Sequence, residues 1–351
     1  MRVLFVQGQP CIRTLKYASA LAEHHPEIRL AFAHQGLTLD AFYGEGDELF
    51  ERWFPIPVEG ARPALEAAID RWRPDIIHHH NLPDTLAVTA IGLVDGAIPV
   101  IHDVHDMWSL RRTEYEDGLP EAVDPATDEK RAVENASAIV AISSQMAREI
   151  RTLHDTRSEI LIYANYATQV GPPPAPNPRD RRLVYEGTLT TNNGHYDLRS
   201  ILRTLGHRGL DVDIYSRRPT ASYRSLGPRV RVRPSLTPSG LMHALGRYGW
   251  GWAGFNSSLN GRHLDTALPN KAFEYVACGV PFVCLPHAAL AEMAREWGVG
   301  LVVDQPEDVG EAIAGADRKA LAEAAVEARE KATVGANIGR LRALYERLSG
   351  K

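Results

Sequence analysis

The chain has 351 residues, of which 44% are apolar and 24% charged, a composition typical of a globular enzyme with two domains. Its 39 lysines and arginines nearly balance its 44 aspartates and glutamates, which argues against a dedicated nucleic-acid-binding protein. No apolar run is long enough for a membrane-spanning helix, and three cysteines without a regular spacing fit a reducing compartment. We expect a cytoplasmic protein, or one held peripherally at the inner face of a membrane. The basic patch at residues 229–233 could contact phosphates or an anionic membrane surface, but a solvated strand face is the better explanation of it.

The first half of the sequence alternates short apolar runs with segments of helical periodicity. Such alternation predicts a parallel sheet with helices on both faces. The runs show little polar alternation, as expected for strands covered on both sides. Strands are predicted at 2–7, 28–33, 74–80, 99–104, 138–143 and 159–165, and helices at 13–25 and 62–72.

The pattern is interrupted at residues 170–181, where five prolines predict a stiff linker. It then restarts, and an amphipathic helix is predicted at the C-terminus. We predict two doubly wound domains that face a shared ligand cleft. Their predicted bounds are 1–169, joined by a C-terminal helix at 337–351 that packs back on it, and 182–336. In the second domain strands are predicted at 182–189, 210–216, 229–232, 249–255, 281–285 and 299–303, with Trp250 and Trp252 in its core.

One stretch, Leu268–Val283, combines helix signals with a charged pair. Pro269 suits the first position of a helix, and Gly279 suits its end. Lys271 and the free N–H groups of the helix N-terminus would hold a diphosphate, and Glu274 would accept hydrogen bonds from ribose hydroxyls. An exposed pair joined by a weak salt bridge accounts for the same spacing equally well.

This stretch resembles the donor-nucleotide motif of GT-B glycosyltransferases, in particular the retaining GT4-like group. Other segments resemble the same group in the expected order, so the resemblance covers essentially the whole chain. It implies an α/β fold with two Rossmann-like domains facing a cleft. It also implies a metal-independent hexosyltransferase that moves a sugar, with retention, from a nucleoside diphosphate sugar to an acceptor hydroxyl in polysaccharide or glycoconjugate biosynthesis. The other segments that resemble this group are PDIIHHHNLPDTL, PVIHDVHDMWS, AIVAISSQM, EILIYANY and LVYEGTL.

The resemblance also implies site residues, and the nucleoside diphosphate sugar would be a co-substrate, with no further cofactor. His105 would lie near the transferred sugar, although a core histidine is the alternative. Two departures are clear: Thr266 stands where many members have a second glutamate, and Thr188 stands where many have a phosphate-binding arginine. The implied donor-binding residues are Gly187, Thr188, Asn270, Lys271, Glu274 and Arg217. From the residues themselves, we predict that Gly8, Arg13 and Asp106 contact the sugar or the acceptor.

Several alternatives stay open from the residues alone. Arg13 is equally well explained as a surface arginine at a helix start. The run His78–His80 suggests a metal cluster with His102 and His105, but neighbouring strand residues point to opposite faces, so at most two of the three share a site and no metal is predicted. Residues 7–13 lack the three glycines of a dinucleotide fingerprint. A UDP-sugar 2-epimerase, and a degenerate protein that binds a nucleotide sugar or a partner subunit, are the other functions considered. The acceptor is a sugar, a lipid-linked molecule or a small molecule, and no nucleic-acid partner is expected.

Overall fold

The computed structural model describes residues 1–113, 124–172, 181–217 and 220–351. The chain divides into two compact units, Met1–Ala164 with Asn337–Lys351 and Asn165–Ala336. The division lies before the expected boundary at residue 169. Part of the segment predicted as a linker, 170–181, packs in the second unit, where the N–H of Gly171 donates to Ala277 O at 3.0 Å. Residues 173–180 of that segment lie outside the described residues.

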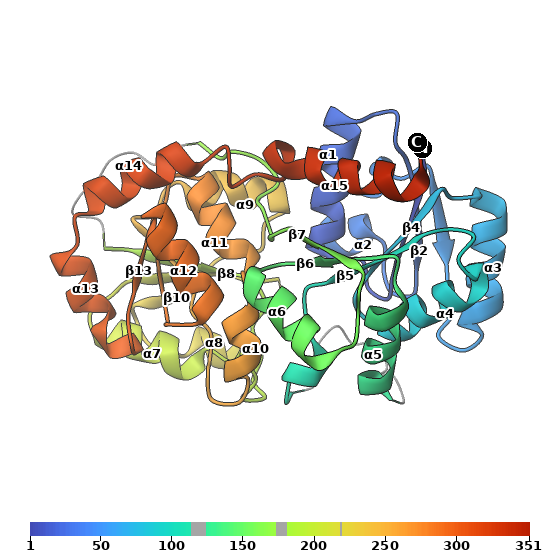
Figure 1. Cartoon of the computed structure of the whole chain (residues 1–351). Coiled ribbons are helices and arrows are strands. Elements are labelled where there is room, and N and C mark those ends of the chain that lie inside the picture. The colour runs from blue at the N-terminus through green and yellow to red at the C-terminus, as the bar shows by residue number, and fades with distance from the viewer. Residues whose placement is uncertain (114–123, 173–180, 218–219) are drawn as a thin grey trace. The chain divides into compact units, whose positions relative to one another are not determined.

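The first unit contains a seven-stranded sheet in the order β3-β2-β1-β4-β5-β6-β7, in which every pair is parallel (Figure 1). Its inner strands are buried along their length because helices cover both faces. The strands are β1 (Arg2–Gln7), β2 (Arg29–His34), β3 (Arg52–Pro55), β4 (Ile76–His80), β5 (Val100–Val104), β6 (Ala138–Ala141) and β7 (Glu159–Ile162). The helices are α1 (Ile12–His24), α2 (Leu39–Tyr43), α3 (Ala61–Trp72), α4 (Asp84–Val94), α5 (Pro125–Asn135) and α6 (Ser144–Leu153), with short 3-10 turns at Asp47–Leu49 and Trp108–Leu110.

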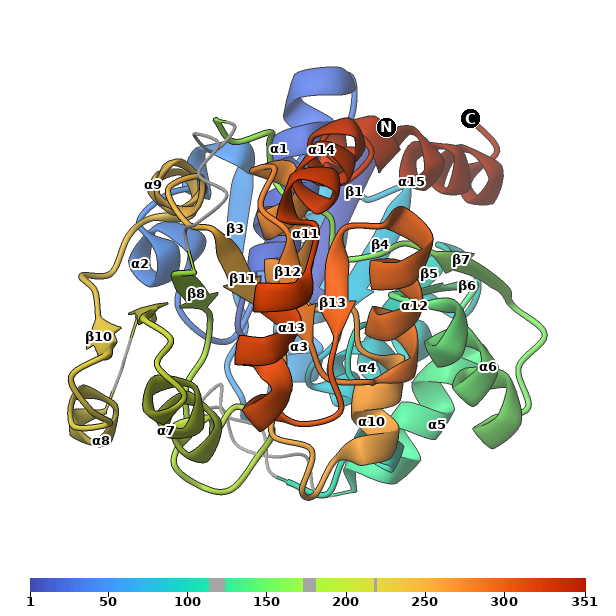
Figure 2. The ribbon, with the colours of Figure 1, turned by 90° about the vertical axis from the view of Figure 1, so that its left-hand side faces the viewer.

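The second unit contains a six-stranded parallel sheet in the order β10-β9-β8-β11-β12-β13, which Figure 2 brings to the front. The strands are β8 (Leu183–Glu186), β9 (Val212–Tyr215), β10 (Val230–Val232), β11 (Trp250–Trp252), β12 (Phe282–Cys284) and β13 (Gly300–Val302). The helices are α7 (Arg199–His207), α8 (Ala221–Arg224), α9 (Pro238–Leu245), α10 (Gly261–Thr266), α11 (Asn270–Ala277), α12 (Ala288–Trp297), α13 (Val309–Gly315) and α14 (Arg318–Ala328), with a 3-10 turn at Pro306–Asp308.

Both sheets are therefore doubly wound, and the predicted α/β fold class is confirmed. The strand order reverses between β1 and β4 in the first unit and between β8 and β11 in the second. In open α/β sheets, ligands bind at the carboxyl ends of the strands at such a reversal. These two edges are the places where predicted site residues should gather.

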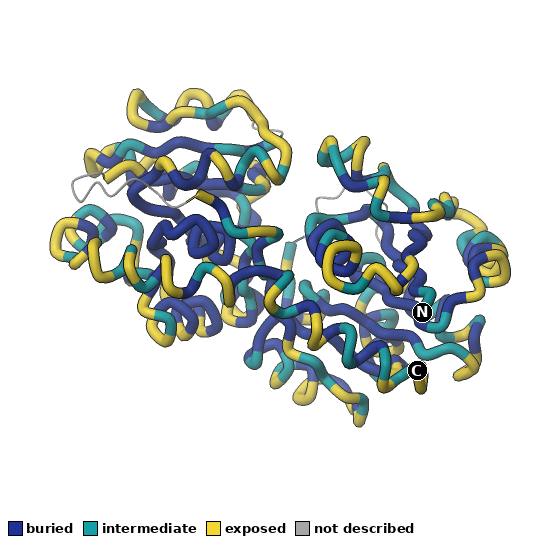
Figure 3. The backbone as a smooth tube through the Cα atoms, turned by 90° about the horizontal axis from the view of Figure 1, so that it is seen from above, coloured by how far each residue is buried: buried dark blue, intermediate teal, exposed yellow. Residues whose placement is uncertain are grey.

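Each unit has its own apolar core. Buried side chains from β1 and β4, including Leu4, Val6 and Ile77, form part of the first. Trp250 and Trp252 are fully buried in the second, as predicted. Figure 3 shows the pattern along the chain: buried stretches run through the interior of each unit, and exposed residues lie mainly at the periphery.

The C-terminal helix α15 spans Val334–Ser349, and residues 337–351 belong to the first unit. The hydroxyl of Tyr345 lies 2.6 Å from His78 Nδ1 on β4. At the surface, Lys351 Nζ lies 2.7 Å from an Asp75 carboxylate oxygen. A buried polar contact and an exposed ion pair thus attach the last residues to the sheet of the first unit.

Among the residues that the structure describes, no helix combines the length and the apolar character needed to cross a membrane.

Candidate functional site

Helix α11 carries the motif singled out in the sequence. It begins at Asn270, and Pro269 is its extended N-cap residue, one position earlier than predicted. The helix ends where predicted: Gly279 has a φ of 67°, a conformation that glycine adopts without strain, and its N–H donates to Val276 O at 2.8 Å. The charged residues therefore lie in the first turns of the helix, at the carboxyl edge of the second sheet.

Lys271 and Glu274 are both buried, with 5% and 7% of their surface exposed. The alternative of an exposed surface pair is therefore wrong. Lys271 Nζ lies 4.9 Å from the ring centroid of Phe255 and 5.2 Å from that of Tyr185, within range of cation–π contacts. Burial lowers the pKa of Lys271, whereas the carboxylates of Glu186 and Glu274 oppose that shift. Lys271 is thus a buried cation beside two aromatic rings, and the carboxylates of Glu186 and Glu274 act on its charge.

The glycine turn after β8 lies against the same lysine. Gly187 has a φ of 127°, which disfavours any side chain, and a Cβ there would lie 3.6 Å from Lys271 Cε. The N–H of Gly187 donates to Tyr215 O at 3.0 Å, which joins the turn to β9. Thr188 follows the turn and is exposed, and its carbonyl accepts a 2.6 Å hydrogen bond from Tyr185. The structure thus places Gly187 against Lys271, and Thr188 follows next in the chain.

For the other residues predicted at the donor site, the structure gives their burial and their position in the chain. Asn270 is half-buried at the first position of α11, and Arg217 is half-buried just after β9. Thr266, which replaces the second glutamate of the family, is buried and donates its hydroxyl to His263 O at 2.7 Å. A threonine used in this way caps the end of α10 rather than presenting an acid.

Sequence reasoning missed two features of this edge. Glu186, the last residue of β8, is buried and acts electrostatically on Lys271. After β12, His287 Nε2 lies 2.9 Å from the Ser257 hydroxyl, and its Nδ1 lies 3.7 Å from an Asp265 carboxylate oxygen. An acid at the end of an otherwise apolar strand was the available signal for Glu186, whereas Ser257, Asp265 and His287 come together only through the fold.

In the first unit, the loop after β5 carries His105 and Asp106. Asn81, which follows β4, holds both residues: its Oδ1 accepts the His105 N–H at 3.1 Å, and its amide donates to Asp106 O. His105 is half-buried, and no hydrogen-bond partner for its Nδ1 occurs in the described part of the chain. Burial lowers the pKa of His105, and the charge of Asp106 opposes this shift. The net lowering of the pKa favours the neutral ring.

Gly8 and Arg13 are not placed as predicted for acceptor-binding residues. Gly8 is buried; its N–H donates to Leu82 O at 3.0 Å, and its carbonyl accepts from Gln35 and Gly36 at 2.9 and 2.8 Å. Its backbone groups are therefore used within the protein rather than offered to an acceptor. Arg13 has 2% of its surface exposed, so the surface interpretation is also wrong.

Arg13 is part of a buried polar network around Asp103. Its Nε lies 3.0 Å from both carboxylate oxygens of Asp103, and its other nitrogens donate to Tyr163 O and Ala164 O at 2.8 and 3.2 Å. Tyr17 donates its hydroxyl to Asp103 at 3.0 Å. Burial alone would raise the pKa of Asp103, but the guanidinium of Arg13 holds it well below the usual range. Arg13 therefore balances a buried charge and is not directed at an anionic acceptor.

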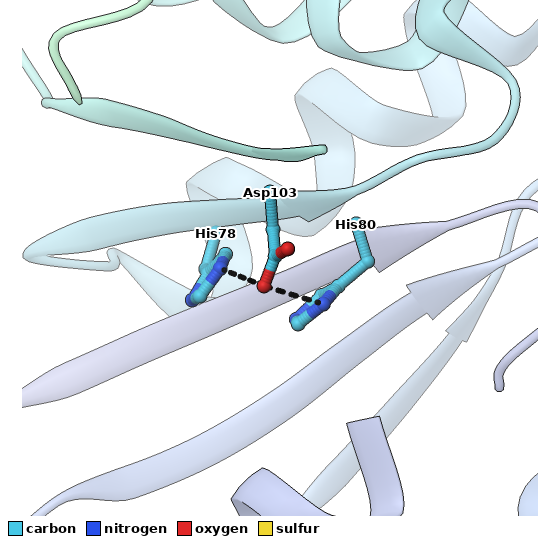
Figure 4. A group of neighbouring side chains, drawn as sticks. All are labelled: His78, His80 and Asp103. Atoms are coloured by element: carbon cyan, nitrogen blue, oxygen red, sulfur yellow. Dashed lines mark ion pairs between the residues drawn. The ribbon is translucent and has the colours of Figure 1, made fainter. Parts of the chain in front are cut away.

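His78 and His80 complete this network, as Figure 4 shows. Their rings are stacked at 4.3 Å, and Asp103 Oδ2 lies 3.5 Å from His78 Nε2 and 3.7 Å from His80 Nδ1. His79 faces the other side of the sheet and lies 3.0 Å, between Nδ1 atoms, from His102. The limit of two histidines per site, derived from strand geometry, is confirmed.

Comparison with known proteins bears on the fold and on the family resemblance. Residues 16–163 match the family model of Glycosyltransferase Family 4, whereas no curated protein matches the chain. Sucrose-phosphate synthase from Thermosynechococcus elongatus superposes with a TM-score of 0.72 at 13% identity, over 99% of each chain. HepE from Anabaena, in complex with UDP-glucose, gives 0.72 at 12% identity over 100% of each chain. The chain has the GT-B fold.

The predicted resemblance to GT4-like glycosyltransferases is therefore confirmed: a family match lies in the first unit, and the GT-B superpositions extend over both. A structure described as a UDP-N-acetylglucosamine 2-epimerase, from Listeria monocytogenes, also superposes, with a TM-score of 0.63 at 14% identity over 98% of this chain and 95% of that one. The GT-B fold thus accommodates more than one activity, and the activity of this chain must be argued from its site.

Proposed function

We propose that the chain is a hexosyltransferase that uses a nucleoside diphosphate sugar as donor and an acceptor hydroxyl as the second substrate, with retention at the anomeric carbon. The observation that carries the proposal is the buried Lys271 at the start of α11, beside the glycine turn at Gly187 and one turn before Glu274. A buried cation at the N-terminal end of a helix binds the charges of a diphosphate.

Each donor-site residue has a proposed task. Lys271 and the N-terminal N–H groups of α11 stabilise the diphosphate as negative charge develops during departure of the leaving group. Glu274, one turn further along, accepts hydrogen bonds from the ribose hydroxyls. Thr188 is exposed beside Gly187 and supplies a hydroxyl and an N–H in place of the family's arginine. Asn270 and Arg217 lie at the same edge and supply further contacts.

In the first unit, His105 positions the transferred sugar, and Asp106 contacts the sugar or the acceptor. Support comes from Asn81, which fixes the backbone of both residues at the carboxyl edge of the sheet. The transfer step is proposed to proceed without a metal ion or further cofactor. HepE structures contain UDP or UDP-glucose, which makes these two molecules the first ligands to test.

Two other functions are considered, and they differ from the transferase in the products expected. A UDP-sugar 2-epimerase is supported by the Listeria structure of the same fold, and it would release an altered sugar together with UDP. A nucleotide-sugar-binding protein without turnover is supported by Thr266 and Thr188, which stand where the family carries charged residues.

The experiment is a thermal-shift screen of UDP, GDP and ADP, followed by product analysis with the matching hexose donors. A ligand that binds the folded state raises the melting temperature by mass action. We expect one of the three diphosphates to stabilise the chain, and its sugar to reach an acceptor hydroxyl with retention. Free altered sugar would identify the epimerase, binding without turnover would identify the degenerate protein, and no stabilisation by any diphosphate would refute all three.

A further inference from the structure

A serine, a histidine and an aspartate meet at the carboxyl edge of the second sheet. His287, which directly precedes α12, has its Nε2 2.9 Å from the Ser257 hydroxyl and its Nδ1 3.7 Å from a carboxylate oxygen of Asp265. Ser257 lies in the loop between β11 and α10, and Asp265 lies on α10. Only 8% of the His287 side chain is exposed, so segments that are separate in the sequence converge on one enclosed ring.

Helix capping does not account for His287. It occupies the N-cap position of α12, where serine, threonine, aspartate or asparagine usually accepts a hydrogen bond from the helix, but its side chain makes no such bond. The first N–H of the helix, that of Ala288, donates instead to Asp265 at 3.2 Å. The His287 side chain is therefore directed at Ser257 and not at its own helix.

The charge beside His287 indicates where the ring proton lies. Asp265 is the charged group that acts on His287 within the described residues, and its carboxylate faces Nδ1. A negative charge there favours the tautomer with the proton on Nδ1, so Nε2 is an acceptor. The Ser257 hydroxyl then donates to Nε2, and the lone pairs of its oxygen face outwards. In this state Ser257 accepts hydrogen bonds from a ligand and does not donate.

Ser257 is exposed, but the backbone on either side of it is fixed. Asn256, the residue before it, donates its N–H to His195 O at 3.0 Å and its side-chain amide to Gly194 O at 3.3 Å, in the loop after β8. The Asn256 side chain also accepts the N–H of Ser258 at 3.1 Å. An exposed hydroxyl whose backbone and proton are both held is a preorganised hydrogen-bond acceptor.

The ring of Phe255 relates Ser257 to the proposed donor site. Its centroid lies 4.9 Å from Lys271 Nζ and 6.5 Å from the centroid of the His287 ring. Both groups also lie at the carboxyl edge where the strand order reverses between β8 and β11. The sugar is the group attached to a diphosphate bound at Lys271, so Ser257 is placed to meet that sugar.

We propose that Ser257 recognises the transferred sugar by accepting a hydrogen bond from one of its hydroxyl groups, and that His287 and Asp265 hold the serine in this accepting state. The inference rests on the proposed function, because it requires a nucleoside diphosphate sugar as donor. It adds to that function a specificity-determining residue, Ser257, and two positioning residues. A site built to pair with a sugar hydroxyl rejects an analogue that lacks it, because the acceptor is then left without its partner.

The test replaces single hydroxyl groups of the sugar by fluorine, which cannot donate a hydrogen bond. Calorimetry on the full chain compares UDP-glucose with its deoxyfluoro analogues, or the glucose conjugates of GDP or ADP if one of these diphosphates stabilises the chain instead. Fluorine at one position should weaken binding to the wild type about 3- to 10-fold, corresponding to one hydrogen bond. In Ser257→Ala that loss should disappear, with UDP binding unchanged. Ser258→Ala, an exposed serine of the same loop, is the matched control and should bind every analogue as the wild type does.

The pH dependence tests the role of His287 separately. Burial holds the pKa of His287 below its ordinary value, and the charge of Asp265 opposes this shift. As the pH falls through that pKa, the protonated ring donates to Ser257 and frees the serine proton to point outwards. The wild type should then tolerate fluorine better at low pH. His287→Gln has no group at this position that titrates and should show no such change.

Three results would overturn the proposal. If no nucleotide sugar binds the wild type, it falls together with the proposed function. If UDP-glucose binds, but Ser257→Ala retains every loss caused by fluorine or weakens UDP and UDP-glucose alike, the proposed function stands and Ser257 does not recognise the sugar. If the preference for hydroxyl over fluorine is lost in Ser257→Ala but does not vary with pH in the wild type, His287 does not set the state of the serine.

Discussion

The ion pair between Arg13 and Asp103 allows a quantitative test of what holds the first unit together. Arg13→Met keeps an unbranched apolar chain but leaves the Asp103 carboxylate buried without its cation. Breaking a buried pair in this way costs about 3–5 kcal/mol, and each lost hydrogen bond to Tyr163 O and Ala164 O adds about 1 kcal/mol. We therefore expect a loss of about 5–7 kcal/mol at neutral pH, enough to unfold a marginal domain.

A double variant and the pH dependence of stability show whether the unpaired charge of Asp103 causes the loss. Asp103→Asn removes the buried charge, so Arg13→Met combined with it should recover about 2 kcal/mol or more of the single variant's loss. In the wild type, the depressed pKa of Asp103 contributes stability above the pKa of an unfolded carboxyl group, and that stability is lost as pH falls through the folded value. In Arg13→Met, burial instead raises the Asp103 pKa, so the penalty should shrink as the pH is lowered.

Urea unfolding of the four proteins at pH 7 and pH 5, read by hydrogen exchange in peptides from β4 and β5, follows the first unit by itself. The reasoning is refuted if the two single losses add within about 0.5 kcal/mol. It is also refuted if Arg13→Met loses the same free energy of unfolding at both pH values.

Two further predictions concern the turn at the donor edge and the C-terminal helix. Gly187→Ala forces an alanine into a positive φ beside the proposed phosphate site, so it should lower both stability, by about 1–2 kcal/mol, and UDP affinity in calorimetry. Gly209→Ala, at a positive φ with open space around it, is the control and should lower stability but leave UDP affinity unchanged. Tyr345→Phe removes the partner of His78 Nδ1 and should cost about 1–3 kcal/mol, with faster hydrogen exchange in residues 337–351. Unchanged exchange in that segment would show that the buried contact does not anchor the helix.

Much of the fold follows from short-range sequence patterns. Continuous apolar runs predict the inner strands because such strands are buried on both faces, and the proline and glycine around α11 predict its ends to within one residue. The edge strand β3 has no such run, and its residues are exposed or half-buried, so it was not predicted. Apolar runs in a sequence reveal strands that are buried, and the edge strand β3 has no fully buried residue.

The polar contacts are harder to predict because the partners lie far apart in the sequence. Arg13 meets Asp103 across 90 residues and Tyr163 across 150, and His78 meets Tyr345 across 267. No local pattern distinguishes such an arginine from one at the surface. The Lys271 motif was recognised because its members lie within one turn of a helix, where sequence spacing fixes spatial neighbours.

The central claim is that Lys271 holds the diphosphate and Glu274 holds the ribose of a bound nucleotide. Calorimetry with UDP and with uridine, on Lys271→Met and Glu274→Gln, tests this directly. We predict that Lys271→Met weakens UDP binding about 10- to 100-fold, corresponding to a lost charge-assisted hydrogen bond, and leaves uridine binding unchanged, whereas Glu274→Gln weakens both. Wild-type UDP affinity in Lys271→Met, or an equal loss for uridine in that variant, would contradict the account.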